Sequence, residues 1–402
     1  MAGIGRIATS GMNAAMADMQ EISNNIANVN TTGFKQAMVN FADVKSGGSI
    51  LGSSGVKVSS IKQDFSAGQI QITNQALDVS INKDGFYIQK DPSTGTVSYT
   101  RAGRFSLSRE GYILGGNGRI QGFPAINGDI STSGLLVDLS VPQTPINPVA
   151  STVVNQVFNL DSSAKPPANA FSINDPTSYN YRIDTTLYDS LGSPNVLSSF
   201  YVSTGTNTWD VNVTINDTPV STFPSGTVTF NSSGTLDAPG GVTGIDNLTW
   251  TPTNGAASPQ PFAIHLTGTT QYATANQVTT NQPNGSPAGV PTGFFIDNDG
   301  IVNVNYSNGR NVLQGQIALA DFHAPENLTR HDNMSWLASN LSGEPVINAV
   351  ASTGAFMGGT IEGSNVDLTN QLVQLLNSQH NFQANAQVQQ TFNQILQTVE
   401  QI

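Results

Sequence analysis

Cysteine is absent from the sequence, so disulfide bonds, catalytic thiolates and thiolate metal sites are excluded. Histidine is scarce, and its 4 residues leave few candidates for acid–base chemistry near neutral pH. Long apolar runs are also missing, since none approaches the roughly 18 residues of a membrane-spanning helix. Polar Ser10, Asn13 and Asp18 interrupt the stretch where a signal peptide needs continuous apolar residues. We therefore expect no membrane insertion and, for an exported protein, a route without a cleaved signal peptide.

Charged residues are few for a chain of 402 residues. They make up 10% of the sequence, against about 25% in ordinary soluble domains. The 15 basic and 27 acidic residues give a net charge of −12, and only Arg310 and Arg330 follow Arg182 among the basic ones. Nucleic acids and anionic membranes reward clustered cations, so neither is an expected partner. Uncharged polar residues replace the charges, and such a surface suits stacking against copies of itself because burying ions costs more.

Motifs for catalysis or cofactor binding are not found in the sequence. There is no Walker A sequence and no Gly-x-Ser-x-Gly elbow. His323 and His331, beside Asp321 and Asp332, are the best candidates for a metal site, but no helical spacing places them together. The run 297–300 resembles part of a calcium loop, yet a β-turn explains it better. We expect no catalytic, cofactor or metal site, and therefore no enzyme.

The N-terminal residues carry apolar side chains at the spacing of an amphipathic helix with one narrow apolar face. After the first member the intervals alternate between 4 and 3, which is a heptad pattern. The pattern predicts a coiled-coil-like helix whose seam consists of Ile4, Ala8, Met12, Ala15, Met19, Ile22, Ile26 and Val29.

The C-terminal residues predict a second helix with an apolar stripe that slips in phase near Val388. Its members are Leu368, Leu372, Leu375, Phe382, Ala386, Phe392, Ile395, Val399 and Ile402. From Gln371 onward Glu400 is the only charge, and glutamines fill the remaining surface. We expect this polar face to be buried between neighbouring subunits, with the termini folding on assembly. Two alternatives to this interpretation remain open. One is a helix pair within an ordinary helical domain, and the other is a disordered Gln-rich tail.

The middle of the chain predicts antiparallel β-sheet. Leu77, Val79 and Ile81 alternate with polar residues, and the turn 83–85 is predicted to join them to the next strand as a hairpin. A second hairpin is predicted around Ser307-Asn308-Gly309. Further runs of alternating apolar and polar residues begin at Trp209 and at Phe262. Such alternation is typical of sheets with one face exposed to solvent.

The predicted fold class is mainly β with terminal α-helices: two nested antiparallel β domains and a coiled-coil-like pair of helices. Pro-rich stretches at 142–167 and 283–291 mark the domain crossings. The expected domains are a terminal helical assembly domain (1–30 and 362–402), a connecting segment (31–74), a first β domain (75–145 and 286–361) and an inserted outer β domain (146–285).

Short motifs at both ends resemble the bacterial flagellar rod and hook proteins. The N-terminal motif residues follow Ser10-Gly11-Met12 and are Ser23, Asn24, Asn25, Ala27, Asn28, Gly33, Phe34 and Lys35. The C-terminal motif after Glu362 is Ser364, Asn365, Val366 and Asp367. The family usually has Leu where this chain has Met12, and methionine fills the same seam position.

The inserted region resembles the hook branch of this family, because rod proteins are shorter and lack such an insert. The similar segments are 187–192 and 230–236, together with Trp209. The resemblance implies a hook subunit that polymerises into a curved hollow helical tube, acts as a universal joint for motor torque, and lets exported subunits pass.

The resemblance also implies the location and partners of the chain. It would be an extracellular part of the flagellum, exported without a cleaved signal by the type III export apparatus. Its partners would be copies of itself, the distal rod, the hook cap and the hook–filament junction proteins. A distal-rod-like axial protein is the first alternative. A secreted β-rich carbohydrate-binding or hydrolytic protein is the second, and it leaves the terminal heptads unexplained.

Overall fold

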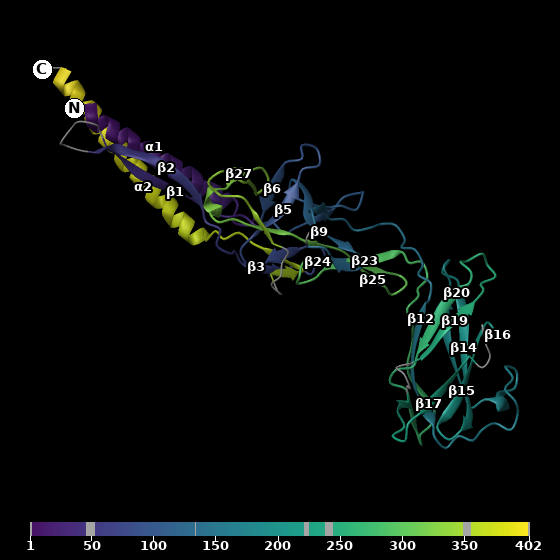
Figure 1. Cartoon of the computed structure of the whole chain (residues 1–402). Helices are drawn as coiled ribbons and strands as arrows, with labels where there is room; N and C mark the ends of the chain where they lie inside the picture. The colour runs from purple at the N-terminus through teal and green to yellow at the C-terminus, as the bar shows by residue number, and fades with distance from the viewer. Residues whose placement is uncertain are drawn as a thin grey trace. The chain divides into compact units, whose positions relative to one another are not determined.

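The computed structural model describes residues 2–45, 53–132, 134–220, 225–237, 244–348 and 355–400. A helix lies at each end of the chain, and the described residues between them form strands and loops (Figure 1). This confirms the predicted mainly β fold class with terminal helices. Contacts divide the chain into unit 1, residues 1–143, 292–305 and 311–402, and unit 2, residues 144–291 and 306–310.

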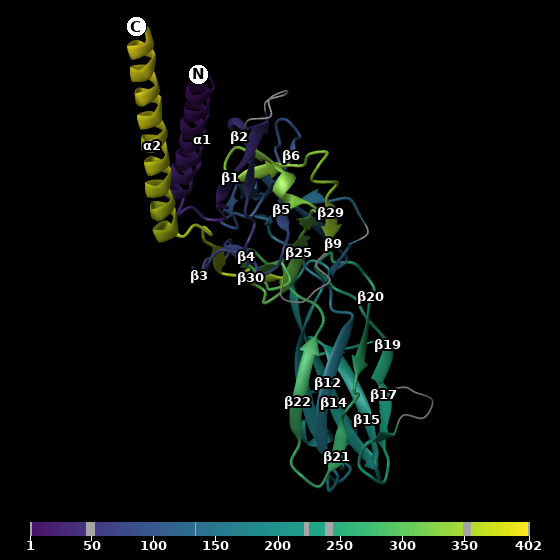
Figure 2. The ribbon, with the colours of Figure 1, turned by 90° about the vertical axis from the view of Figure 1, so that its left-hand side faces the viewer.

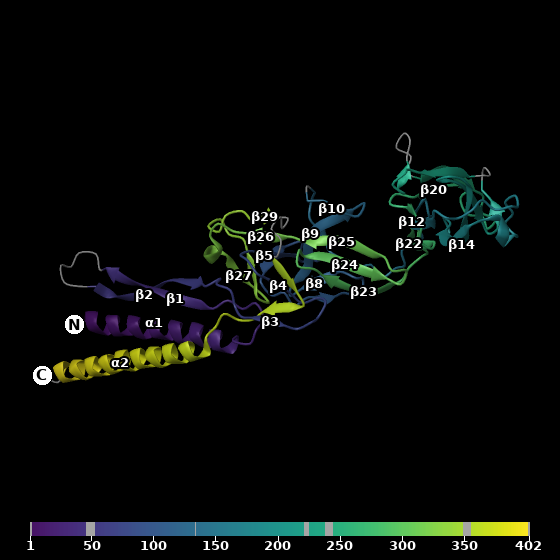
Figure 3. The same cartoon turned by 90° about the horizontal axis from the view of Figure 1, so that it is seen from below.

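The two terminal helices of unit 1 pack side by side in antiparallel orientation. Helix α1 spans Ala2–Ala27 and helix α2 spans Leu368–Glu400. The N-terminus of α1 and the C-terminus of α2 lie at the same end of the pair (Figure 3). Helix α2 begins where the Asp367 side chain accepts hydrogen bonds from the backbone N–H groups of Thr369 and Asn370, at 2.9 and 3.2 Å.

A β-hairpin packs along the other side of α1. Its strands, β1 (Ala37–Lys45) and β2 (Ser53–Gln63), pair antiparallel, and both contact α1. In Figure 1 and Figure 3 the hairpin follows the same direction as the helices. The segment that sequence analysis treats as a connection therefore contains a hairpin that extends the helical part of the unit.

A 14-stranded sheet forms the body of unit 1. Its central path runs β23-β24-β25-β9-β5-β6-β28-β27, with short strands branching from it. The strands are β5 (Phe86–Lys90), β6 (Val97–Thr100), β7 (Ser106–Leu107), β8 (Ile113–Gly115), β9 (Gly118–Ile126), β10 (Asp129–Ile130), β11 (Val137–Asp138), β23 (Pro291–Ile296), β24 (Ile301–Tyr306), β25 (Asn311–Ile317), β26 (Leu319–Asp321), β27 (Thr329–His331), β28 (Ser335–Leu337) and β29 (Val346–Asn348). A 3-10 turn, η2, covers Pro325–Asn327.

Two small sheets complete unit 1, and each joins an early strand to a late one. Strand β3 (Ile70–Ile72) pairs with β31 (Thr360–Glu362), and β4 (Val79–Ile81) pairs with β30 (Phe356–Gly358). Aromatic rings fill the core beside the large sheet: Phe86 contacts Phe65, Phe322 and Trp336 edge to face.

Unit 2 consists of two sheets that enclose one apolar core (Figure 2). The five-stranded sheet contains β12 (Val153–Asp161), β19 (Gly244–Trp250), β20 (Gln260–His265), β21 (Thr270–Tyr272) and β22 (Gln277–Pro283). The six-stranded sheet contains β13 (Tyr181–Tyr188), β14 (Pro194–Gly205), β15 (Thr208–Ile215), β16 (Thr218–Pro219), β17 (Gly226–Phe230) and β18 (Leu236–Asp237), and the 3-10 turn η1 (Pro176–Ser178) precedes it. Side chains from both sheets, such as Phe158 and Trp209, are fully buried between them.

The strand pairings correct two details of the sequence prediction. Strand β12 pairs parallel with β20 and β21, although antiparallel pairing was expected throughout. Residues 83–85 do not close a hairpin, because β4 pairs with β30 whereas β5 pairs with β6, β9 and β26. The hairpin at 307–309 is confirmed by the β24–β25 pair. The turn at 297–300 is confirmed by the hydrogen bond from the Gly300 N–H to the Asp297 carbonyl, 3.0 Å.

Leu197→Ala tests the core of unit 2. The Leu197 side chain is fully buried, and truncating it leaves a cavity that costs about 2–5 kcal/mol. We expect thermal unfolding of the variant to begin at a clearly lower temperature than in the wild type. Val196→Ala, one residue earlier on the same strand and 45% exposed, is the matched control and should unfold like the wild type. Equal effects of the two substitutions would contradict the placement of the core.

Candidate assembly site at the terminal helices

The predicted seam residues of α1 lie where the helix meets its neighbours. Ala8, Ala15 and Ile22 are buried, and Met12, Met19 and Ile26 are half-buried. Glycines let α2 come close: a Cβ atom on Gly11 would lie 2.6 Å from the Asn385 side chain, and one on Gly5 would lie 2.9 Å from the Phe392 ring. Gly11 of the motif Ser10-Gly11 therefore has a packing role in the helix pair.

The predicted stripe of α2 divides between two environments. Leu375, Phe382, Ala386 and Phe392 are half-buried. Leu368, Leu372 and Ile395 are 43, 46 and 47% exposed in the single chain. The Val399 side chain and Ile402 lie outside the described residues. The structure thus places only part of the stripe against α1.

Polar residues that the stripe omitted take the remaining positions of the α2 face. Gln371 and Ser378 are 2 and 3% exposed. The Ser378 hydroxyl donates a hydrogen bond to the Asp18 carboxylate, and the Asn25 amide donates one to the Gln371 side-chain oxygen, 3.2 Å. A search for apolar spacing cannot find these residues, although positions 371, 375, 378 and 382 follow the same 4-3 rhythm.

The asparagine-rich motif at the end of α1 ties the helix to the hairpin. Buried Asn25 accepts a hydrogen bond from the Ala37 N–H, 3.0 Å, and donates one to the Ala37 carbonyl, 2.9 Å. Asn28 donates to the Asn24 side-chain and backbone oxygens, which stabilises the helix end. Near the other end of α1, the Ser10 hydroxyl accepts from the Val56 N–H of β2, 3.1 Å. Two further motif residues, Ser23 and Ala27, are exposed.

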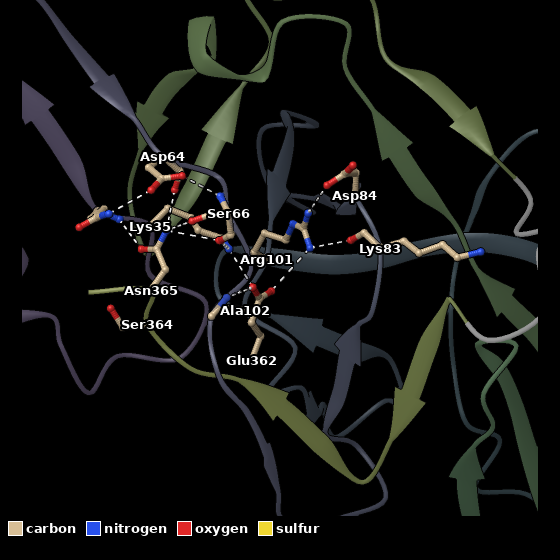
Figure 4. Close-up of polar contacts among 12 residues, drawn as sticks. Lys35, Asp64, Ser66, Lys83, Asp84, Arg101, Ala102, Glu362, Ser364 and Asn365 are labelled. Atoms are coloured by element: carbon tan, nitrogen blue, oxygen red, sulfur yellow. Dashed lines mark hydrogen bonds and ion pairs between the residues drawn. The ribbon is translucent and has the colours of Figure 1, made fainter. Parts of the chain in front are cut away.

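The motif Gly33-Phe34-Lys35 forms the turn that leads from α1 into the hairpin. Gly33 has φ +70°, and a Cβ atom there would lie 2.6 Å from the Ala102 nitrogen, so only glycine fits without strain. Phe34 is buried, and Lys35 is completely buried. The Lys35 ammonium donates to the Glu362 carboxylate, 2.8 Å, and to the Ser66 carbonyl, 2.5 Å (Figure 4).

Glu362 also faces a second buried cation. Its Oε2 atom lies 3.6 Å from Nη1 of Arg101, and the same Arg101 nitrogen donates to the Lys83 carbonyl, 3.0 Å (Figure 4). Arg101 Nη2 lies 4.0 Å from the fully exposed Asp84 carboxylate. We call Lys35, Arg101 and Glu362 the ion cluster. The side chains of all three are at most 3% exposed.

Burial makes the ion cluster important for the stability of the junction. Desolvation lowers the pKa of Lys35, the neighbouring Glu362 raises it, and Arg101 lowers it again, with a net shift downward. A buried pair is an uncertain source of net stability, but removing one partner strands a charge and costs about 3–5 kcal/mol. Loss of any one member of the ion cluster is therefore expected to destabilise this junction strongly.

The C-terminal motif continues from the ion cluster into α2. The Asn365 side chain accepts from the Gln36 N–H, 2.8 Å, and donates to the Asp64 carbonyl, 2.8 Å. The Ser364 hydroxyl accepts from the Val366 N–H, 3.3 Å, and the Val366 side chain is buried. With Asp367 as the cap of α2, each motif residue has a structural task at the junction.

Outside the helices, the candidate metal residues stay apart. His323 and Asp321 line a pocket beside Arg101, and His331 lines a different one beside Lys35. Across the part of the chain that the structure describes, no three His, Cys, Asp or Glu side chains gather to hold a metal ion. Neither described helix is long and apolar enough to cross a membrane.

Apolar side chains remain exposed on the helical part of unit 1. On α2 they include Val373 and Leu376, 52 and 55% exposed, beside the three stripe residues named above. On the hairpin they are Met38, Phe41, Val58 and Ile61, each 40–48% exposed. Exposed apolar side chains gathered on one part of a molecule are typical of a surface that another protein covers. The geometry therefore supports an assembly surface.

Acid titration tests the contacts of Asp64, which lies beside the ion cluster. Burial alone would raise the pKa of Asp64, but hydrogen bonds from Gln36 and Ser66 and the charge of Lys35 lower it below 3.8 overall. The ionised form thus stabilises the fold above pH 3.8, and this stability is lost as the pH falls through the lower folded value. We expect Asp64→Asn to flatten the acid limb of a plot of melting temperature against pH. An unchanged acid limb would contradict this.

Comparisons with known proteins agree over 98% of the chain. Three family models match: "Flagella basal body rod protein" at residues 6–35, "Flagellar basal body protein FlaE D2 domain" at 159–286, and "Flagellar basal body rod FlgEFG protein C-terminal" at 357–402. The chain is 35% identical over 401 residues to the flagellar hook protein FlgE of Salmonella typhimurium, with 98% of each chain covered. It is 36% identical over 403 residues to FlgE of Escherichia coli, again covering 98% of each chain.

A solved structure shares the fold. The crystal structure of the Helicobacter pylori flagellar hook protein FlgE2 aligns with a TM-score of 0.51 and 13% identity, covering 74% of this chain and 99% of that one. At this identity the likeness concerns the fold alone. The sequence matches go further, because they are 35 and 36% identical and cover 98% of the chain, and they show that this chain belongs to the flagellar hook protein family.

Proposed function

We propose that the chain is the structural subunit of the flagellar hook and polymerises into a curved hollow helical tube. The observation that carries this proposal is the match to hook proteins over 98% of the chain, which includes the inserted region between the two terminal motifs. In this role the polymer transmits motor torque to the filament as a universal joint and lets exported subunits pass through its bore. The subunit has no catalytic task in such a structure.

The helical part of unit 1 supports polymerisation. A single helix pair and one hairpin leave apolar side chains such as Leu372, Ile395 and Phe41 43–47% exposed, and neighbouring subunits would cover them. If each contact joins two different surfaces and the rotation does not close, the result is an open helical polymer. Residues 1–30 and 362–402 would then form its assembly domain, and 146–285 its outer β domain.

The uncharged surface supports the remaining parts of the proposal. With 10% charged residues, a channel wall built from these helices would hold passing unfolded chains only weakly. Outer contacts without buried ion pairs would leave no desolvated charge tied to a single partner, so neighbouring subunits could exchange these contacts as the hook bends. The distal rod, hook cap, hook–filament junction proteins and type III export apparatus would be its partners.

Electron microscopy of flagellar basal bodies from a strain that lacks this gene tests the proposed function. We expect complete rods that end without a hook, and hooks restored when the gene is returned on a plasmid. Missing or truncated rods would place the protein in the rod instead. Intact hooks with filaments would remove it from the flagellar axis.

Substitutions at two isoleucines distinguish packing within the helix pair from contacts at the assembly surface. Ile22 is 3% exposed and Ile395 is 47% exposed in the single chain. We expect Ile395→Asp to leave the far-UV circular dichroism and melting of the chain unchanged but to block its polymerisation, because the new charge faces a neighbour. Ile22→Asp should disturb the helix pair itself. Ile395→Val keeps an apolar side chain and should polymerise, and normal polymers from Ile395→Asp would contradict the surface assignment.

A further inference from the structure

The segment 355–367, which we call the strap, runs between the body of unit 1 and helix α2. Its strand β30 pairs with β4, and its strand β31 pairs with β3. Neither strand belongs to the 14-stranded sheet. The aromatic and aliphatic core cluster around Phe86, Tyr99 and Trp336 also contains no strap residue. The strand pairings of the large sheet and this core cluster therefore do not include the strap, which contacts the sheet through the packing of Phe356 on Tyr87 of β5.

The strap in turn supplies hydrogen-bond acceptors for backbone N–H groups in the N-terminal part of unit 1. The N–H groups of Gly33, Thr73 and Asn82 each donate to a strap carbonyl at 2.8 Å. The N–H groups of Gly68 and Gln36 donate to the side chains of Glu362 and Asn365, both at 2.8 Å. These five amides, spread from 33 to 82, depend on one short segment that follows nearly three hundred residues later.

The strap is an interior element rather than a surface one. Phe356 is completely buried and stacks against the Tyr87 ring at 6.2 Å. Ile361 and Glu362 are 4 and 1% exposed. At Gly68 a Cβ atom would lie 2.1 Å from the Gly363 carbonyl, so the two backbones touch directly. Nothing larger than glycine fits there while the strap is seated.

The charge of Glu362 favours either a fully seated strap or an open junction, with little stability for states in between. Glu362 supplies the carboxylate for Lys35, 2.8 Å, and for Arg101, 3.6 Å. Without the strap these two cations would face each other across a junction that can close only by burying both. Burying both cations without the Glu362 carboxylate would be costly, so we expect the junction to close only when Glu362 is in place.

We infer that the strap is a closing element that seats on an otherwise folded unit 1, with Glu362 as the positioning residue that allows the junction to close. Helix α2 begins at Leu368, directly after the strap, so seating also sets where α2 meets α1. The consequence for assembly rests on the proposed function: only a chain whose strap is seated presents the complete helix pair to its neighbours.

Hydrogen exchange of the full-length chain, followed by mass spectrometry, tests the strap. In Glu362→Gln we expect the amides of Gly33, Gln36 and Gly68 to exchange at least tenfold faster than in the wild type. Amides of β5 and β9 in the large sheet should keep their protection. The control is Asp138→Asn, which breaks the half-exposed Arg119–Asp138 ion pair, 2.8 Å, and should leave the strap-bound amides unchanged.

A second variant separates the role of charge from simple loss of packing. Lys35→Met in the Glu362→Gln background removes one of the two stranded cations, and we expect it to recover part of the lost protection. If Glu362→Gln does not fold, the wild type at increasing denaturant gives the same answer: strap-bound amides should open before those of β5. Uniform acceleration throughout unit 1, or no acceleration anywhere, would overturn the inference.

The assembly consequence has its own measurement. At a temperature where β5 and β9 stay protected, Glu362→Gln should polymerise at least tenfold more slowly than the wild type. Normal polymerisation with an unseated strap would overturn this step. A strain without the gene that still makes hooks would refute the proposed function instead, and the exchange result would be unaffected by that outcome.

Discussion

The burial of the Glu362 carboxylate between two cations is the constraint on which the junction between the terminal helices, the hairpin and the strap depends. Lys35 and Glu362 lie 327 positions apart in the sequence, yet their atoms meet at 2.8 Å with almost no exposure. An ion in such a place is tolerated only when its partners are fixed. Gly33, the hairpin entry and the start of α2 are consequently all held to one point, which lies where α1 ends and α2 begins.

Few charged side chains lie between α1 and α2, so other contacts set the register of the helix pair. The seam joins Asn25 to Gln371 and Asp18 to Ser378, and glycines at 5 and 11 admit the larger α2 side chains. Polar groups that must find partners in a seam fix its register more strictly than apolar ones, which slide at little cost. The pair is thus defined by hydrogen bonding and shape more than by apolar area.

Periodicity was enough to predict the two helices and the β-rich middle, because 3.5- and 2-residue repeats distinguish a helix from a strand. It did not predict Gln371 and Ser378 in the seam, since polar residues carry no apolar signal even when they keep the right spacing. Nor did it show that Lys35 and Glu362 are buried, because burial of a charge depends on partners distant in sequence. The parallel pairing of β12 has the same non-local origin.

The same reasoning explains why the apolar stripe and the buried face of α2 differ. Toward α1 the helix presents polar Gln371 and Ser378 together with part of the stripe, such as Phe392, whereas Leu372 and Ile395 remain exposed. Polar contacts need exact partners, which suits a pairing made once within one chain. Apolar contacts are non-directional and tolerate small shifts, which suits a contact repeated between subunits of a bending polymer. A single helix can therefore keep its intramolecular register while its outer contacts adjust.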